Sequence, residues 1–526
     1  MRPPYDPYAA KPDTVRTYAD TIITKATAVQ GIDTESLKQK ARAAENITGE
    51  LADKLDEPFK TIGKDADQIA LVSAFVSGTL YTWASAISTF NSGVETLNTE
   101  WSNRSSGPAG GLSPAAIEEA LVKDLNRRWR GLDATLDTAA DDLKTELNAG
   151  PDKTSVLEYF ASGALPESAF PLLSTVGIDP KKAKSVLADL RTFLAESKNG
   201  GVSKERMEAW FNMLETVKGM DPNAASVILG ALSDKELKAL HDEIGGIPEN
   251  HMNSATDFYS FVLAGATREQ VDHLKDLWDL NPAGKDDWGP RDAGVSLFYP
   301  PYVVPGENGG TAIGAEQGSV DDCWMLAKLN AIVTADPDWP MEHVRDNNNG
   351  TVSVKFYDGD GKPYWVTVTD EVSDSAAYND GGPNESSWAI YYEKAMAADD
   401  HSPGGLVGGP GYDGLTAGFS DSADEYMTGK ESDTVKFTGL DLFADPYEAA
   451  VEAHDNGEGV VAGNWGNDGM PWADEDDDLK QWHVYYVKDI LPNGDVLLGN
   501  PWGEEDVTMS PGDFNTYLED VSVVKQ

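Results

Sequence analysis

The sequence predicts a multidomain α+β protein, with helices alone in residues 1–287 and helices mixed with strands in residues 288–526. In the first part, apolar residues recur every three or four positions, which is the period of an amphipathic helix. In the second part, mainly after residue 430, short β-branched and aromatic runs alternate with turn signals, which is typical of strands. Residues 280–290, rich in proline, glycine and aspartate, form the predicted linker.

Residues 1–150 are predicted to form a bundle of four long helices. Their apolar stripes begin near Asp13, Leu37, Ile69 and Ser113. The third is the clearest, because ten apolar residues from Ile69 to Trp101 follow one another at steps of three or four. Residues 68–94 carry no charge, but serines lie off the apolar seam, whereas a membrane span is apolar all round. We therefore expect a packed bundle helix and no stable membrane insertion.

Residues 151–287 are predicted to form a domain of shorter helices that contains a two-copy repeat. Gly177-Ile178-Asp179-Pro180 recurs 42 residues later as Gly219-Met220-Asp221-Pro222, and each is followed by a helical apolar pattern. In both copies the aspartate is a good N-cap and the proline a good first-turn residue. No catalytic or metal-binding pattern is visible in this region.

The only cysteine of the chain, Cys323, is the candidate nucleophile. The apolar residues that follow it have helical spacing, so Cys323 is expected in the first turn of a buried helix, where backbone N–H groups and the helix dipole favour a thiolate. Gln317 lies six residues upstream and is a candidate donor to the oxyanion that forms when a thiolate attacks a carbonyl. The alternative is that Cys323 is simply a small buried apolar residue.

A candidate base and its partner lie near the other end of the chain. His483 begins a run typical of a strand, residues 491–494 form a turn signal, and a second strand leads to Asn500. A hairpin about this turn brings His483 and Asn500 to the same end of the ladder, and a catalytic imidazole needs such an orienting partner. The rival bases are His343, His401 and His454, none of which is predicted on a strand that also delivers an Asn or Asp acceptor.

These segments resemble the calpain-type cysteine proteases. Residues 317–324, Gln-Gly-Ser-Val-Asp-Asp-Cys-Trp, resemble the active-site segment of that family, and residues 500–503 match its Asn-Pro-Trp-Gly. Residues 365–370 resemble its Trp-Val-x-Val-x-x-Asp strand, and residues 388–395 its Trp-x-x-Leu-Leu-Glu-Lys-Ala helix. The motifs occur in the family's order and cover about residues 290–526.

The resemblance implies a papain-like catalytic domain over residues 288–526, with a helical lobe and a β-rich lobe. Cys323 would be the nucleophile, His483 the base, Asn500 the residue that orients it, and Gln317 an oxyanion donor. Trp324 would pack beneath the site. Trp502 would shield the bond between His483 and Asn500 from water.

The sequence departs from the family at Asp321, where a glycine is usual, and at Trp482, where a small residue usually precedes the histidine. Glu393 matches a glutamate of the family's first calcium site, but Gly314 stands where its aspartate partner is expected. The acidic loop of the second site is almost absent after Asn-Pro-Trp-Gly. The chemistry requires no cofactor, and these departures argue against calcium activation, although the acidic run 474–478 could bind cations loosely.

The N-terminal bundle is similar to the helical secretion domains of the WXG type, although Trp101-Ser102-Asn103 lacks the glycine of that motif. An oligomerisation or substrate-presenting module is the other interpretation. The first eight residues contain no apolar stretch, so no standard signal peptide is expected. The protein is therefore expected in the cytoplasm, or secreted by another route through partners of this bundle.

The net charge is −48, of which −34 lies in residues 288–526. Such a surface repels nucleic acid and anionic membranes, so neither is an expected partner. The first functional hypothesis is a cysteine endopeptidase that acts on protein or peptide substrates and is a candidate secreted effector. The alternative is a non-catalytic interaction or scaffold protein on a decayed protease fold.

Overall fold

The computed structural model divides the chain into two compact units. Unit 1 comprises residues 1–200 and 219–237, and unit 2 comprises residues 201–218 and 238–526. The predicted boundaries after residues 150 and 287 do not coincide with these limits. The structure describes residues 3–44, 50–104, 114–196, 208–209, 211–213, 216–217, 219–245, 253–285, 288–290, 297, 315–373, 387–399, 401–403, 411–436, 445–464, 479–503, 506–518 and 520–525.

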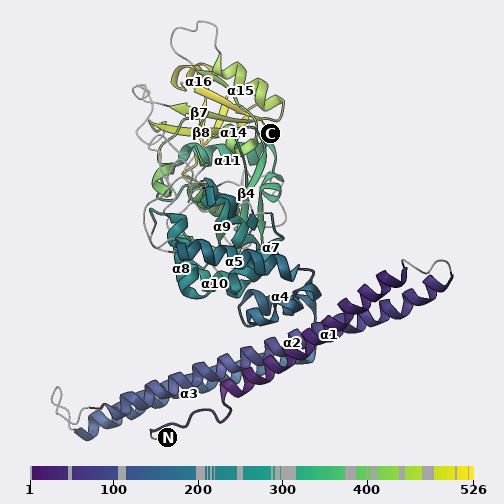
Figure 1. The fold of residues 1–526 in the computed structure, drawn as a ribbon. Coiled ribbons are helices and arrows are strands. Elements are labelled where there is room, and N and C mark those ends of the chain that lie inside the picture. Colours follow the sequence, from purple (N-terminus) through teal and green to yellow (C-terminus); the bar gives the residue numbers. More distant parts are fainter. Residues whose placement is uncertain are drawn as a thin grey trace. The chain divides into compact units, whose positions relative to one another are not determined.

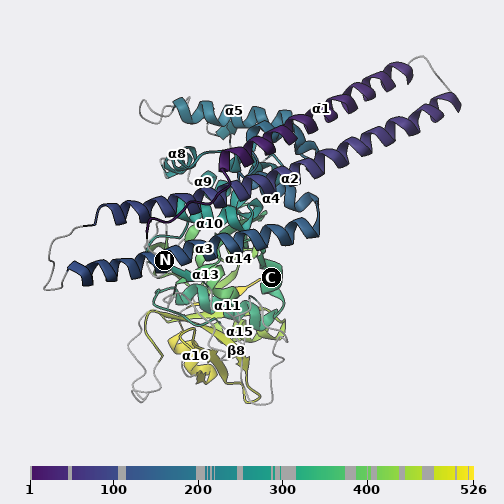
Figure 2. The same cartoon turned by 90° about the horizontal axis from the view of Figure 1, so that it is seen from below.

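Three long helices form the first part of unit 1: α1 (Pro12–Ala44), α2 (Glu50–Ser102) and α3 (Pro114–Ala149). Helix α1 packs along the first half of α2, and α3 packs along the second half (Figures 1 and 2). The prediction of four helices is wrong, because residues 37–62 are divided between the end of α1 and the start of α2. Gly63, the one glycine between the two apolar stripes, lies inside α2, where glycine costs only about 1 kcal/mol relative to alanine.

The second half of α2 contributes to the core of the bundle. Residues Lys64–Ser102 are long and apolar enough to cross a membrane by length and composition alone, a test that core helices of soluble bundles also pass. The buried residues Ile87, Phe90 and Val94 share a hydrophobic cluster with Leu125 of α3 and with Tyr5. Burial of this face against α3 accounts for its apolar period.

Shorter helices complete unit 1. They are α4 (Lys153–Ala161), the 3-10 segment η1 (Glu167–Val176), α5 (Pro180–Glu196) and α7 (Pro222–Gly230). The predicted caps of the two repeat copies are confirmed, because Asp179 accepts from the N–H of Lys181 at 2.8 Å and Asp221 from that of Asn223 at 2.9 Å. Helix α8 (Asp234–Gly245) follows and runs from unit 1 into unit 2.

Unit 2 combines helices with three antiparallel sheets. Its helical segments are α9 (Asn253–Gly265), α10 (Arg268–Leu277), α11 (Cys323–Ala335), α12 (Trp339–His343), α13 (Trp388–Ala398), η5 (Tyr412–Leu415), α14 (Asp424–Thr428), α15 (Pro446–Asp455) and α16 (Pro511–Tyr517). Its strands are β1 (Trp288–Pro290), β2 (Val344–Asp346), β3 (Thr351–Tyr357), β4 (Pro363–Thr369), β5 (Glu371–Ser373), β6 (Asp433–Lys436), β7 (Gly459–Asn464), β8 (His483–Ile490), β9 (Val496–Gly499), β10 (Val507–Met509) and β11 (Asp520–Val524). The chain is therefore an α+β protein, as predicted.

The strands form a six-stranded sheet in the order β10-β9-β8-β7-β11-β6, a three-stranded sheet β2-β3-β4, and the pair β1-β5. The predicted hairpin between residues 352 and 368 is confirmed, with Tyr357 opposite Pro363 and a turn in which Asp358 accepts from the N–H groups of Asp360 and Lys362. These bonds explain the Asp-Gly-Asp-Gly sequence as a turn.

The six-stranded sheet is covered on both faces, because side chains alternate along each strand. On one face, Val461 and Val484 lie in a cluster with α11, α13 and the three-stranded sheet. On the other face, Ala462 and Tyr485 lie in a second cluster with α15 and α16. Strands β7 and β8 are thus buried on both sides, and α11 packs directly against them (Figure 1).

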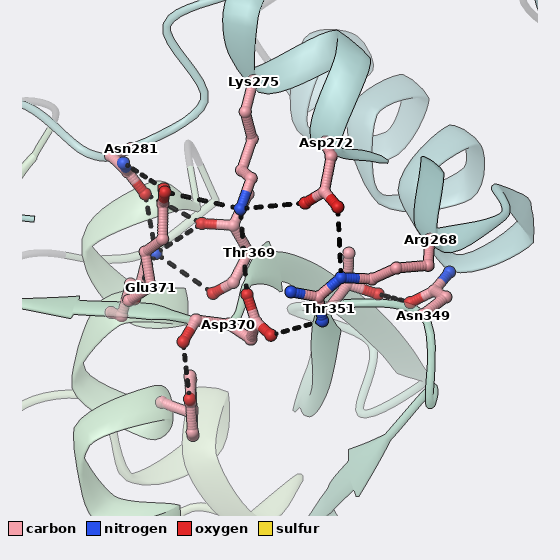
Figure 3. Close-up of polar contacts among 11 residues, drawn as sticks. Arg268, Asp272, Lys275, Asn281, Asn349, Thr351, Thr369, Asp370 and Glu371 are labelled. Carbon is pink, nitrogen blue, oxygen red and sulfur yellow. Dashed lines mark hydrogen bonds and ion pairs between the residues drawn. The ribbon is translucent and has the colours of Figure 1, made fainter. Parts of the chain in front are cut away.

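Residues 253–285, predicted to lie in the short-helix domain, belong to the same compact unit as the catalytic candidates. Figure 3 shows the polar network that joins α10 and the following loop to the end of β4 and to α13. The fully buried Lys394 donates through Nζ to the Oδ1 atom of Asn281 at 2.7 Å, to Oγ1 of Thr369 at 2.7 Å and to the carbonyl of Glu371 at 2.7 Å. These buried bonds fix the segment around Asn281 to the C-terminal part of the chain.

Candidate active site

Helix α11 begins at Cys323, the position predicted for the candidate nucleophile. Trp324, Met325 and Leu326 are fully buried, so the apolar face of the helix holds the cysteine at its N-terminal end. The indole N–H of Trp324 donates to the carbonyl of Leu415 at 2.9 Å, and this bond anchors the first turn of α11. The backbone N–H of Val484 lies close enough to the Cys323 thiol to lower its pKa, so the sulfur lies near the residue that follows His483.

The environment of Cys323 favours the thiol over the thiolate. Burial raises its pKa to about 11, and the neighbouring carboxyls of Asp322 and Asp321 act in the same direction. The N–H groups of Val484 and Trp324 lower the pKa, but by less than burial raises it. The expectation that the helix N-terminus would favour a thiolate at Cys323 is therefore wrong, because burial raises the pKa of the thiol by more than these N–H groups lower it.

His483 and Asn500 are brought together at one end of a hairpin, as the spacing predicted. His483 is the first residue of β8, the turn at residues 491–494 closes the hairpin, and Asn500 directly follows β9. The Nε2 atom of His483 lies 2.9 Å from Oδ1 of Asn500. Because this oxygen only accepts, Nε2 carries the proton and Nδ1 is left as the basic nitrogen.

Aromatic rings enclose the imidazole of His483, which is only 1% exposed. The ring of Trp502 lies 4.3 Å from it between centroids, and Tyr485 meets it edge-on at 4.9 Å. The N–H of Trp502 also donates to Oδ1 of Asn500 at 3.0 Å, which holds the amide in place. Burial lowers the pKa of His483 to about 4, so the imidazole is neutral at pH 7.

Gln317 lies next to the loop that carries Asn500, and its backbone N–H donates to the carbonyl of Pro501 at 2.7 Å. Its side-chain amide donates through Nε2 to the carbonyl of Val320. An amide nitrogen has two hydrogens, so this bond leaves one to donate elsewhere. The segment before Cys323 and the segment after Asn500 are therefore tied together.

The rival histidines have other partners. Nδ1 of His343 lies 2.9 Å from the carbonyl of Trp339, on which the ring is stacked, and His454 lies 3.7 Å from Asp489. His401 pairs with Asp399 at 2.9 Å, an Asp-His contact that sequence analysis missed although the two residues are only two positions apart. These histidines have structural contacts of their own. His483, in contrast, begins β8, the strand that packs against the helix of Cys323.

A second pair missed from the sequence is formed by Asp322 and Glu393, which are both fully buried beside the start of α11. Burial and the nearby Glu393 carboxyl raise the pKa of Asp322, so it holds a proton more readily than an exposed aspartate. Burial raises the pKa of the Tyr412 hydroxyl, and the nearby carboxyls of Glu393 and Asp322 raise it further. Asp322 directly precedes Cys323, and this adjacency was the only sequence signal for the pair.

Glu393 was the candidate calcium ligand. Calcium takes six to eight oxygen ligands, whereas within the described ranges no group of three or more His, Cys, Asp or Glu side chains is placed to hold a metal ion. Gly314 and the acidic residues 474–478 and 504–505 lie outside the described residues. A calcium-binding role of Glu393 therefore stays a prediction.

Comparison with known proteins leaves the family of the chain open. No protein-family model matches the sequence, and no curated protein matches it.

Proposed function

We propose that residues 288–526 form a two-lobed, papain-like cysteine endopeptidase of the calpain type, which hydrolyses protein or peptide substrates. The observation that carries this proposal is the distance of 2.9 Å between Nε2 of His483 and Oδ1 of Asn500, because β8, which begins at His483, packs against α11, which begins at Cys323. The candidate nucleophile lies on α11, the candidate base on β8, and the candidate orienting amide directly after β9, the strand paired with β8.

The chemistry follows from these roles. Nδ1 of His483 accepts the proton of the Cys323 thiol as the sulfur attacks the peptide carbonyl. The backbone N–H at Cys323 and the free amide hydrogen of Gln317 donate to the oxyanion. The imidazolium then gives its proton to the leaving amine, and water attacks the thioester to release the acid and restore the thiol.

The pKa shifts define the resting state in this mechanism. A thiol with a pKa of about 11 and an imidazole with a pKa of about 4 remain a neutral pair at pH 7. Proton transfer then accompanies attack on the substrate and does not precede it. Asn500 supports this transfer, because its hydrogen bond favours the protonated, charged form of His483.

The alternative is a non-catalytic scaffold, and the raised pKa of Cys323 is the observation that favours it. In that case the partly exposed Cys323 and the buried His483 are remnants of a site, and the long helices of unit 1 provide the interaction surface. The same helices serve as a docking or export module if the protein is a protease.

The two functions are separated by incubating the full chain with an unfolded protein substrate and identifying the fragments by mass spectrometry. Matched samples contain the Cys323→Ala and His483→Ala variants at the same concentration. The protease proposal expects fragments from the wild type alone. Equal cleavage by all three proteins, or cleavage by none, contradicts it, and the second result favours the scaffold.

A further inference from the structure

A cavity of about 290 Å³ lies inside unit 2, where helix α9 and residues 279–283 meet β4 and the end of α13. Cys323, His483 and Asn500 are not among the described residues that line it. Protein interiors are close-packed, and voids larger than a water molecule are few in one domain. An apolar cavity of about 150 Å³ is large enough for benzene, so this one has room for a molecule of about two fused rings.

The cavity is largely apolar, and small residues account for its space. Thr256, Ser260 and Leu263 of α9 line it and share one face of that helix at spacings of four and three. The buried Val366 and Val368 of β4 add apolar walls. Small residues complete the lining, among them Ala283, Ala397 and Gly411.

Hydrogen bonds fix the walls of the cavity. Asn281, which lines it, donates through Nδ2 to Oε2 of Glu371 at 3.0 Å and accepts from Oγ1 of Thr369 at 2.9 Å (Figure 3). The N–H of Gly411 donates to the carbonyl of Ala397 at 3.1 Å, which joins two of the small lining residues. A site whose walls are already held loses little conformational entropy when a ligand binds.

Ser260 gives the cavity a buried polar group that can orient a ligand. This residue is 6% exposed, and its Oγ atom accepts from the backbone N–H of Thr367 at 3.0 Å. A hydroxyl that accepts a hydrogen bond still carries a hydrogen to donate. Ser260 can therefore donate to a hydroxyl or carbonyl oxygen of a molecule in the cavity.

The charge of the lining favours an uncharged ligand. Among the described residues that line the cavity there is no Lys, Arg or His, so an anion would lose its hydration without gaining a cation. Asp279 also lines the cavity, but this aspartate is exposed and offers no buried counter-ion to an amine.

We propose that this cavity binds a small uncharged ring compound, of about ten to twelve non-hydrogen atoms, that carries one hydroxyl or carbonyl oxygen. The ligand would join α9 to β4 and α13, and so stabilise the docking of residues 253–285 on the C-terminal part of the chain. Helix α9 and residues 279–283 precede the segment that resembles the calpain-type proteases. The inference does not depend on the proposed endopeptidase function.

The test uses the full chain and three probes that share a two-ring body: 2-naphthol, naphthalene and 2-naphthoate. Probe fluorescence measures each Kd. We expect the Kd of 2-naphthol to be about 3- to 10-fold below that of naphthalene, because of Ser260, and at least about 10-fold below that of 2-naphthoate. Both neutral probes should raise the temperature of thermal unfolding. Absence of binding by the neutral probes at their solubility limits, or equal affinity for 2-naphthoate and 2-naphthol, overturns the proposal.

Two variants place the binding in this cavity. Ala397→Leu fills part of it and should weaken both neutral probes at least about 10-fold. Ser260→Ala should remove the preference for 2-naphthol over naphthalene, whereas Ser522→Ala, at a buried serine outside the cavity, should keep it.

Thermal unfolding without a probe shows whether each variant folds. Ala398→Leu, at the partly buried end of α13, takes the place of Ala397→Leu if that variant does not fold. Unchanged binding in the filled variant, or an unchanged preference in Ser260→Ala, means that the probes bind elsewhere and overturns the proposal. None of these measurements uses cleavage of a peptide, so their outcome is separate from that of the protease test.

Discussion

The buried pair of Lys328 and Asp424 gives a sharp test of how α11 is held. The Lys328 side chain is fully buried, and its Nζ atom contacts the Asp424 carboxylate and the carbonyl of Ser422. Asp424, which is 4% exposed, also accepts from the hydroxyl of Ser522 at 3.0 Å. Lys328→Met leaves the carboxylate buried without a cation, so we expect the free energy of unfolding to fall by about 3–5 kcal/mol.

Replacing both partners should behave differently. Lys328→Met with Asp424→Leu removes both charges of this pair, and the lost bonds to Ser422 and Ser522 should cost about 2 kcal/mol or less. Urea unfolding followed by near-ultraviolet circular dichroism measures each variant. Lys488→Met, which breaks the more exposed bridge of 2.8 Å to Asp506, is the matched control and should cost about 1 kcal/mol or less. The single variant Asp424→Leu is measured as well. A loss of unfolding free energy in the double variant equal to the sum of the losses in the two single variants would refute this reasoning.

Three further predictions concern the candidate site. Asn500→Ala removes the acceptor of His483 and should lower kcat/KM about 5- to 150-fold, the equivalent of about 1–3 kcal/mol; an unchanged value excludes an orienting role. Because the pKa of His483 is lowered to about 4, kcat/KM should stay flat from pH 7 to about pH 5 and fall only as the base protonates near pH 4. A fall centred near pH 6.5 would show an unperturbed imidazole. Gly418→Ala would place a Cβ 2.5 Å from the buried indole of Trp324 and should destabilise the protein by about 1–3 kcal/mol, whereas Gly359→Ala, with no neighbour within 4 Å, should change stability by less than about 0.5 kcal/mol.

The pH dependence of stability follows from the same histidine. Between pH 6.5 and pH 4 the unfolded chain binds a proton that the folded chain does not, so stability is lost as the pH falls through this window. The loss due to His483 is about 3 kcal/mol, from about 1.4 kcal/mol for each pH unit. The difference between wild type and His483→Gln in urea unfolding at pH 7 and pH 4 measures it.

The features that sequence analysis predicted correctly have local signatures. The start of α11 follows from the apolar period after Cys323, and the hairpin of β8 and β9 follows from two strand patterns around a turn. The proximity of His483 and Asn500 then follows from counting residues on either side of that turn. Their catalytic roles are not tested by this proximity and remain predictions.

The features that it missed depend on contacts between distant residues. Lys394 meets Asn281 across 113 positions, and no local pattern reveals that this loop belongs with unit 2. The pKa of Cys323 likewise depends on how deeply α11 is packed and on the carboxyls around it. A helix N-terminus is visible in a sequence, but the desolvation that opposes it is not.

The most direct test of the central claim is labelling of the single thiol with an irreversible epoxide probe that carries a peptide. The wild type is compared with His483→Ala, each with and without calcium, and intact mass gives the extent of labelling. We expect rapid labelling of the wild type, a loss of at least about 100-fold in His483→Ala because general base catalysis is removed, and no calcium response. Labelling no faster than that of a free thiol, and equal in both proteins, would show that Cys323 and His483 do not act together and would contradict the protease proposal.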